Sequence, residues 1–173
     1  RDKGEDRQLP EYRFDYCFPG DALGFKWTVL VGRERLSKSW MATTVPTKGG
    51  TGAFGVDKCL DFITECGDSE NKIIIKTDQE LAILKLKEAV TRTFDGEVVP
   101  EESPVGESQA NGAVEEAGKT IRELMKVYRC QLEDHVGQLE DSSIILQWLA
   151  RWAAMSYNRF QQVRDGRTPF QRQ

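Results

Sequence analysis

The stretch Ile73-Ile74-Ile75-Lys76-Thr77-Asp78-Gln79 is an apolar run that ends on a carboxylate. A run of this kind is typical of a strand that is buried on both faces of a sheet. Asp15 likewise follows a strand-like stretch, and Glu115 opens a long helical pattern, with 36 residues between it and Asp78. Three carboxylates on rigid elements suit hard divalent cations, which take oxygen ligands and leave positions for water and substrate phosphates.

The distribution of apolar and turn-forming residues predicts an α/β protein. Strands are expected where β-branched and aromatic residues concentrate, at 11–18, 24–32, 39–45 and 73–76. Helices are expected where apolar residues return at helical spacing, at 52–65, 79–91, 113–133 and 142–159. Residues 95–110 are predicted to be mostly loop. Three early strands, followed by helices that alternate with short strands, imply a mixed sheet flanked by helices.

Length and composition fit one folded domain. The chain has 173 residues, of which 39% are hydrophobic and 30% charged, which is unlike a disordered protein. No apolar run approaches the roughly 20 residues needed to cross a bilayer, and no signal-peptide pattern opens the chain. We expect a flexible linker at residues 1–10, a core domain at 11–160 and a basic C-terminal extension at 161–173. Because the first residue is Arg1 and not Met, we also expect a piece of a longer polypeptide.

Cysteine and histidine usage favours a reducing compartment. Cys17, Cys59, Cys66 and Cys130 show no Cys-x-x-Cys spacing, and His135 is the only histidine. We therefore expect buried reduced thiols and no structural zinc site. His135 has no nucleophile pattern beside it and is interpreted as a surface residue.

Net charge is −4, whereas phosphate binding calls for Lys and Arg. The charges are unevenly placed, however. Five carboxylates without an intervening base precede Glu115, at positions 95, 97, 101, 102 and 107, and four arginines against Asp165 give the chain end a net charge of +3. The average charge therefore says little about the surface near the three carboxylates.

The ordered set of motifs resembles the catalytic core of retroviral and retrotransposon integrases, DDE-type polynucleotidyl transferases of the RNase H-like superfamily. The similar segments are Thr28-Val29-Leu30-Val31, Ile74-Ile75-Lys76-Thr77-Asp78-Gln79-Glu80, Glu102-Ser103-Pro104, Ser108-Gln109-Ala110-Asn111-Gly112-Ala113-Val114-Glu115 and Asp165-Gly166-Arg167-Thr168-Pro169-Phe170. They span roughly residues 11 to 172. The resemblance implies an RNase H-like mixed five-stranded sheet with helices on both faces.

The same resemblance implies that Asp15, Asp78 and Glu115 are the catalytic residues and hold two Mg²⁺ or Mn²⁺ ions. It implies 3′-end processing and strand transfer on DNA, with element ends and target DNA as partners. It further implies a homo-oligomer, flanking domains of a longer polyprotein, no membrane partner, and action in the nucleus within an integration complex.

Alternatives remain open at each carboxylate. Asp15 is alternatively a surface strand residue, and Asp78 the N-cap of the following helix. Asp21 competes with Asp15 but lies in a turn after Pro19-Gly20. Glu115 is followed by Glu116, where family members often carry a basic residue, and only one of the two can face the aspartates.

A basic stripe follows Glu115 on the same predicted helix, formed by Lys119, Arg122, Lys126 and Arg129. The stripe is interpreted either as a solvated face or, joined to a metal site, as a DNA-backbone contact. Ser108, Gln109 and Asn111 either contact DNA near the reactive phosphate or belong to a polar linker. Trp148, Trp152, Met155 and Phe160, at helical spacing, are expected to pack in the core, with an exposed part able to serve a dimer interface.

Two other functions compete with integration. One is a catalytically weak, integrase-derived domain for nucleic-acid binding or assembly, favoured by the acidic charge and by Glu116. The other is an RNase H-like nuclease acting on RNA–DNA hybrids, which the Asn-Gly-Ala-Val-Glu context around Glu115 disfavours.

Overall fold

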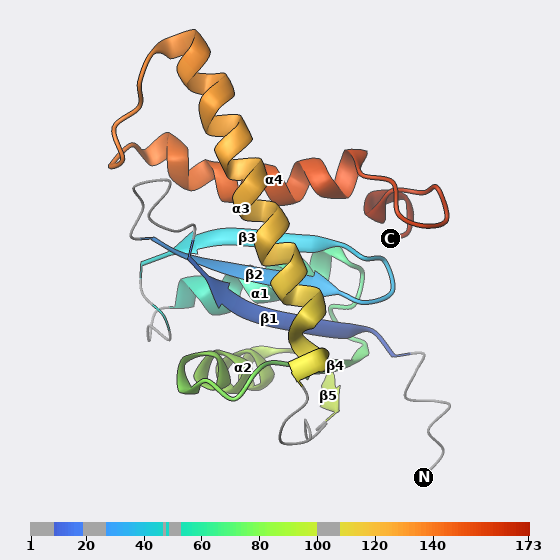
Figure 1. Ribbon diagram of the computed structural model, residues 1–173. Helices are drawn as coiled ribbons and strands as arrows, with labels where there is room; N and C mark the ends of the chain where they lie inside the picture. Colours follow the sequence, from blue (N-terminus) through green and yellow to red (C-terminus); the bar gives the residue numbers. More distant parts are fainter. Residues whose placement is uncertain (1–8, 19–26, 47, 49–52, 100–107) are drawn as a thin grey trace.

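A mixed sheet of five strands organises the chain, in the order β3-β2-β1-β4-β5 (Figure 1). The computed structural model describes residues 9–18, 27–46, 48, 53–99 and 108–173, with the side chains of residues 108–111 excepted. The predicted mixed five-stranded sheet is confirmed. Its helices lie on both faces, as the sequence also indicated.

The first three strands form an antiparallel meander: β1 (Glu11–Cys17), β2 (Thr28–Glu34) and β3 (Trp40–Val45). Side chains along β1 alternate, so Tyr12, Phe14 and Tyr16 are buried in the core on one face of the sheet. Gly32 lies opposite Phe14, and a Cβ there would come within 2.8 Å of the Phe14 ring. The aromatic core therefore requires glycine at this position.

Two parallel strands complete the sheet. β4 (Lys72–Lys76) pairs with β1, and β5 (Glu97–Val99) pairs with β4. The interpretation of residues 95–110 as mostly loop was wrong at β5. Three residues at a sheet edge are too few to show the period-two pattern that identifies a strand.

Four helices cover the two faces. α1 (Ala53–Glu65) and α2 (Leu81–Thr93) pack on the aromatic core through residues such as Phe62, Ile63 and Ile83. α3 (Ser108–Val136) and α4 (Ile144–Phe160) cover the other face, where Val29 and Val31 meet apolar residues of both helices. α3 runs obliquely across β1 and β2 in Figure 1.

Some predicted boundaries were wrong. α3 begins at Ser108, five residues before the predicted start, because its first turn is built from small and polar residues that show no apolar periodicity. α2 begins at Leu81, after the N-cap Glu80, and not at Gln79. β2 ends at Glu34 instead of residue 32, since its ladder with β1 continues to Glu34.

α4 is fixed to the edge strand β3 by a side chain that imitates a strand partner. The Asn158 side chain accepts a hydrogen bond from the Trp40 amide at 2.8 Å and donates one to the Trp40 carbonyl at 2.7 Å. The Trp40 ring stacks on Tyr157, with 3.3 Å between the ring centroids. These contacts satisfy an edge backbone that would otherwise be free to pair with another chain.

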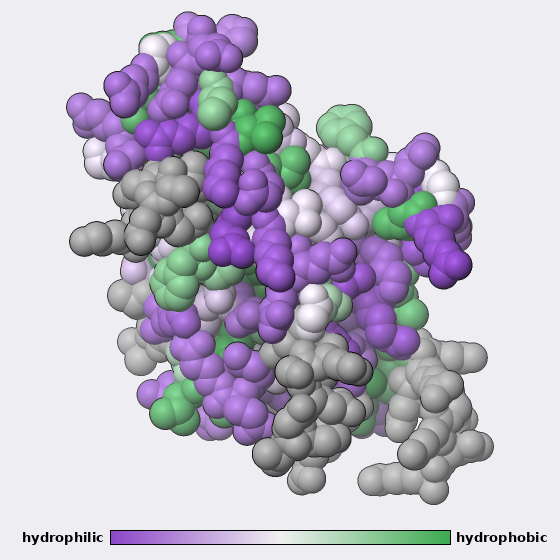
Figure 2. All heavy atoms as spheres, viewed as in Figure 1, coloured by the Kyte–Doolittle hydropathy of each residue, from purple (hydrophilic) through white to green (hydrophobic). Residues whose placement is uncertain are grey.

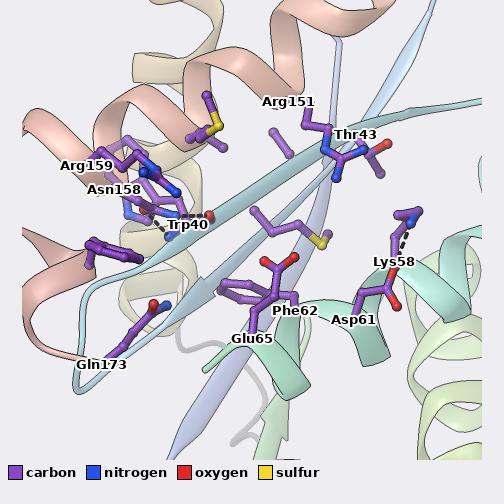
Figure 3. Close-up of a pocket in the computed structure, with 15 residues that line it drawn as sticks. Trp40, Thr43, Lys58, Asp61, Phe62, Glu65, Arg151, Asn158, Arg159 and Gln173 are labelled. Carbon is purple, nitrogen blue, oxygen red and sulfur yellow. Dashed lines mark hydrogen bonds and ion pairs between the residues drawn. The ribbon is translucent and has the colours of Figure 1, made fainter. Parts of the chain in front are cut away.

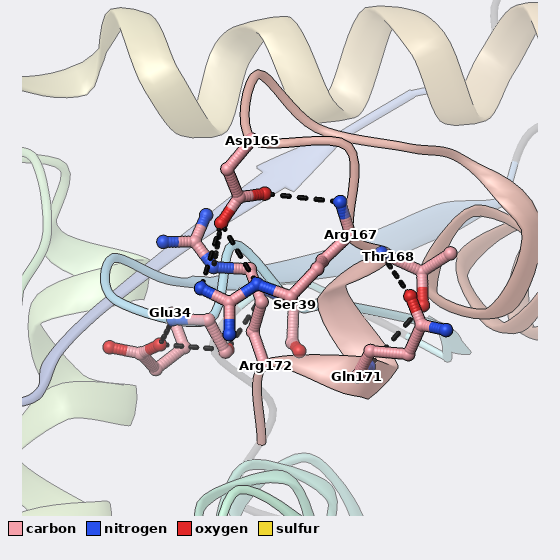
Figure 4. A network of polar contacts seen from close by, with 8 residues as sticks. Glu34, Ser39, Asp165, Arg167, Thr168, Gln171 and Arg172 are labelled. Carbon is pink, nitrogen blue, oxygen red and sulfur yellow. Dashed lines mark hydrogen bonds and ion pairs between the residues drawn. The ribbon is translucent and has the colours of Figure 1, made fainter.

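The last residues pack back against the turn between β2 and β3 (Figure 4). Thr168 and Gln171 form a reciprocal capping box around a 3-10 turn at Pro169–Gln171. Asp165 pairs with Arg167 at 2.9 Å and with Arg172 at 3.8 Å. Part of the positive charge expected of residues 161–173 is therefore neutralised within the segment itself.

The four cysteines are unpaired, and their exposure varies. Cys59 is buried as predicted, Cys17 and Cys66 are partly exposed, and Cys130 is exposed, so the expectation of a buried thiol was wrong there. Among the described residues, no helix combines the length and apolar character that a membrane crossing requires.

Candidate active site

Asp15 lies near the C-terminal end of the central strand, on the face covered by α3. Alternation along β1 sends Phe14 and Tyr16 into the aromatic core and leaves Asp15 on the opposite face. Its Oδ1 accepts a hydrogen bond from the Tyr16 amide at 2.8 Å. Asp21, the competing candidate, lies outside the described residues.

Asp78 is brought beside Asp15 by the pairing of β1 with β4. The strands are parallel, and Arg13 is paired with Lys76. Asp15 and Asp78 each come two residues after this last pair of the ladder. Adjacent parallel strands thus bring the two carboxylates near enough for the charge of Asp78 to raise the pKa of Asp15.

The Asp78 carboxylate also supports the start of α2. Its Oδ1 accepts a hydrogen bond from the Glu80 amide at 2.9 Å, while the N-cap residue itself is Glu80. The capping alternative is therefore correct in part, because Asp78 binds an amide at the entrance to the helix without being its N-cap.

Glu115 reaches the same place from the helix. Val114 and Ala117 are buried against the sheet, so Glu115 is turned to the exposed side of α3. Asp15 and Glu115 line one cavity of about 240 Å³, whose apolar wall includes Val31 and Val114.

Electrostatics connect the three predicted carboxylates. The pKa of Asp15 is raised to about 6, chiefly because burial disfavours the ionised form. The negative charges of Asp78, Glu115 and Glu80 raise it further, against the Tyr16 amide, which lowers it. Asp15 therefore feels the negative charges of the other carboxylates, an effect that a bound cation would offset.

The donor set fits a hard divalent cation by its chemistry. All three candidates supply carboxylate oxygens, which Mg²⁺ and Mn²⁺ prefer. Within the part of the chain that the structure describes, no three Asp, Glu, His or Cys side chains are gathered closely enough to form a metal cluster.

The basic stripe on α3 divides into two halves. Lys119 and Arg122 line the cavity with Asp15 and Glu115. Lys126 pairs with Glu123 at 2.8 Å on its own helix. The visible surface over α3 is mostly hydrophilic (Figure 2).

Arg129 serves the turn between α3 and α4 and not the cavity. It pairs with Glu133 at 2.9 Å and with Asp141 at 3.0 Å, and it donates a hydrogen bond to the Leu139 carbonyl. Arg129 is therefore engaged in ion pairs at this turn, whereas Lys119 and Arg122 line the cavity.

The remaining predicted residues have separate positions. Gln109 and Asn111 belong to the first turns of α3, not to a loop, and their side chains lie outside the described part of the chain. Glu116 is exposed and does not line the cavity. His135 is exposed, as predicted, with Nδ1 at 2.7 Å from the Gln131 carbonyl oxygen.

Sequence reasoning missed two neighbours of the site, Phe18 and Lys48. Phe18 lines the cavity, and the Lys48 ammonium lies 4.8 Å from the centre of its ring. Phe18 comes only three residues after Asp15, and this closeness in the sequence could have indicated that it lies near the site. Lys48 had no comparable signal, because it lies in the break after β3.

Comparisons with known proteins bear on the fold. No protein-family model matches the chain, and no curated protein matches it in sequence. Among solved structures, a trimeric form of the HTLV-2 integrase catalytic core domain in complex with magnesium has a TM-score of 0.66 at 17% identity, with 95% of this chain and 97% of that chain covered. Its dimeric form gives a TM-score of 0.63 at 15% identity, over 95% and 96%. The chain has the RNase H-like fold of a retroviral integrase catalytic core.

A simian T-cell lymphotropic virus intasome in complex with PP2A regulatory subunit B56 gamma also contains this integrase core fold. Its TM-score is 0.65 at 18% identity, and the match covers 95% of this chain but 54% of that one. At these identities the likeness concerns the fold, so the chemistry must be argued from the residues themselves.

A second cavity, of about 370 Å³, lies away from the carboxylates between α1, β3 and α4 (Figure 3). Asp61 and Glu65 of α1 and Arg151 and Arg159 of α4 are among the side chains that line it. None of the three candidate carboxylates does so. The cavity lined by Asp15 and Glu115 and the cavity between α1, β3 and α4 are therefore separate.

Proposed function

We propose that the chain is an integrase catalytic core that performs metal-dependent phosphoryl transfer on DNA. The observation that carries the proposal is the cavity that Asp15 and Glu115 share with Lys119 and Arg122, with Asp78 close enough to Asp15 to raise its pKa. Acidic groups for metal and basic groups for phosphate occur together there, as cutting and joining a nucleic-acid backbone requires.

Asp15, Asp78 and Glu115 would hold two Mg²⁺ or Mn²⁺ ions. When bound, such ions stabilise the attacking and leaving oxygens of an in-line displacement. Lys119 and Arg122 bind phosphates that flank the reacting one, and Lys126, Gln109 and Asn111 extend the contact along the strand. Water is the nucleophile in 3′-end processing, and the DNA 3′-hydroxyl is the nucleophile in strand transfer, so no covalent protein intermediate is needed.

Variants of the three carboxylates test the proposal directly. Asp15→Asn, Asp78→Asn and Glu115→Gln should each abolish nicking and joining of DNA in Mg²⁺ or Mn²⁺, because an amide is a poor ligand for these ions. Asp57→Asn on α1 and Glu116→Gln, both exposed and outside the cavity, are matched controls that should keep activity. Unchanged activity in all three site variants would remove the site.

A catalytically weak binding or assembly domain is the second candidate. The net charge of −4, the acid at Glu116 beside Glu115, and the Asp78 oxygen bound to the Glu80 amide favour it. Salt-dependent binding of DNA by a wild-type protein that shows no metal-dependent cleavage would select this candidate.

Assembly of several copies belongs to the same proposal. Trp148 and Trp152 are 61% and 51% exposed on the outer side of α4, which is unusual for large apolar side chains. We assign this surface to contact between copies of the chain. The assembled protein would act on element ends and target DNA in the nucleus, together with flanking domains of a longer polyprotein.

A further inference from the structure

Phe18 leaves an aromatic ring open at the mouth of the carboxylate cavity. The side chain is 48% exposed and lines the cavity together with Asp15 and Glu115. A single exposed apolar side chain is ordinary on a protein surface. What distinguishes Phe18 is its place beside Asp15 and Glu115.

The ring is held in place by charged neighbours. The Lys48 ammonium lies 4.8 Å from the ring centre, within the range of a cation–π contact. The same ammonium pairs with both carboxylate oxygens of Glu80, at 2.9 and 3.0 Å. Because the Glu80 backbone amide in turn donates a hydrogen bond to Asp78, the ring is connected to the candidate metal site through Lys48 and Glu80.

The surroundings of the ring define the ligand. Lys119 and Arg122 line the same cavity and suit phosphate oxygens, while the open ring suits a flat π-surface. A nucleotide carries both groups on one unit. Bases inside a duplex are covered on both faces by their neighbours, so a base other than the last of a blunt end must be unpaired to offer its face to the ring.

We propose that Phe18, held by Lys48, is a stacking platform for one unpaired base of the strand whose phosphate lies at Lys119 and Arg122. The inference rests on the proposed function and narrows its substrate to DNA with an opened end. Phe18 acts here as a binding residue, and Lys48 is a positioning residue that acts through it.

A fluorescent base tests the platform. The probe is a DNA duplex with two unpaired terminal nucleotides, the outer one 2-aminopurine, and a blunt duplex of equal length serves as comparison. Wild-type protein should quench the 2-aminopurine and bind the opened end more tightly than the blunt one. Phe18→Leu should lose the quenching and weaken binding of the opened end by about 5- to 150-fold, the range that one base–aromatic stack represents. Phe18→Trp should restore both.

Phe54 on α1 provides a matched control. It is 47% exposed, and the Lys58 ammonium lies 5.8 Å from its ring centre, yet it does not line the cavity. Phe54→Leu should leave quenching and binding unchanged. The inference would be overturned if Phe18→Leu weakened binding of opened and blunt ends equally, or if Phe54→Leu had an effect as large as that of Phe18→Leu. It would also be overturned if the wild type showed no preference for the opened end.

Metal-dependent nicking by the same preparations separates this inference from the proposed function. Stacking that is present in a wild type unable to cleave DNA would retain the platform and refute the catalytic proposal. If the protein cleaves DNA but Phe18→Leu changes neither the quenching nor the preference for opened ends, the catalytic proposal is retained and the platform is refuted.

Discussion

At the scale of single residues, Asp15 is the carboxylate most affected by its neighbours in the candidate site, because three other carboxylates raise its pKa and none lowers it. A helix or strand pattern cannot reveal such a group, since its partners come from α3 and from the connection between β4 and α2. The sequence motifs predicted Asp15, Asp78 and Glu115 as site residues, whereas the Glu80 contribution appears only when the entrance to α2 is seen.

The raised pKa of Asp15 predicts a pH dependence of stability in protein freed of metal by a chelator. The folded protein keeps the Asp15 proton up to about pH 6, while the unfolded chain releases it near the ordinary pKa of 3.8. The folded state therefore binds more protons between these values, and the free energy of unfolding falls as the pH rises from about 4 to about 6.

Asp15→Asn should remove this part of the dependence, so that the variant gains roughly 1–3 kcal/mol over wild type between those pH values. Urea denaturation at a series of pH values measures the difference. Asp57→Asn is the control and should follow the wild-type curve. A parallel pair of curves for wild type and Asp15→Asn would show that Asp15 titrates normally.

At the scale of elements, the sheet and helices were predictable wherever apolar residues recur over several positions. β1, β3, β4 and α1 lie within a residue or two of their predicted ranges. β5 and the first turn of α3 were missed, because a three-residue edge strand and a run of small polar residues have no period to detect. The meeting of Asp15 with Asp78 was predicted on the condition that their strands are neighbours, and the parallel register of β1 with β4 meets that condition.

The junction of α4 with β3 gives a prediction for one side chain. Asn158→Ala removes both hydrogen bonds to the Trp40 backbone and should destabilise the fold by about 1–3 kcal/mol, since a partly buried donor and acceptor lose their partner. Thermal unfolding followed by circular dichroism measures the loss. Gln147→Ala, at an exposed position of the same helix, should change stability little. Equal unfolding temperatures for the two variants would argue that the junction contributes nothing.

At the scale of the whole molecule, the carboxylate cavity and the apolar groove beside α4 are lined by different residues. The carboxylate cavity and the cations of α3 form one region, while the exposed apolar residues of α4 form another, where Tyr128 and Leu132 of α3 help to line a groove of about 800 Å³ with Trp148 and Trp152. The sequence placed the tryptophans at helical spacing but predicted core packing for them. Their exposure depends on which face of α4 meets the sheet, and Leu146, Leu149 and Ala153 occupy that face.

The exposed face of α4 predicts self-association. Trp148→Ala and Trp152→Ala should each weaken it by at least about tenfold, as expected for truncation of a central aromatic residue at an interface. Sedimentation velocity over a range of protein concentrations measures the effect. Leu81→Ala, on α2 at 76% exposure, is the control and should leave the oligomer intact. A wild type that stays monomeric at every concentration would contradict the assignment.

The proposed function requires that carboxylates far apart in the chain share divalent cations. Crystals soaked in Mn²⁺ and measured at its absorption edge test this most directly. We predict anomalous density between Asp15 and Asp78, about 2.1 Å from their carboxylate oxygens, with Glu115 as a further ligand. The proposed metal site would be contradicted if saturating Mn²⁺ left this place empty or bound only at other acidic residues.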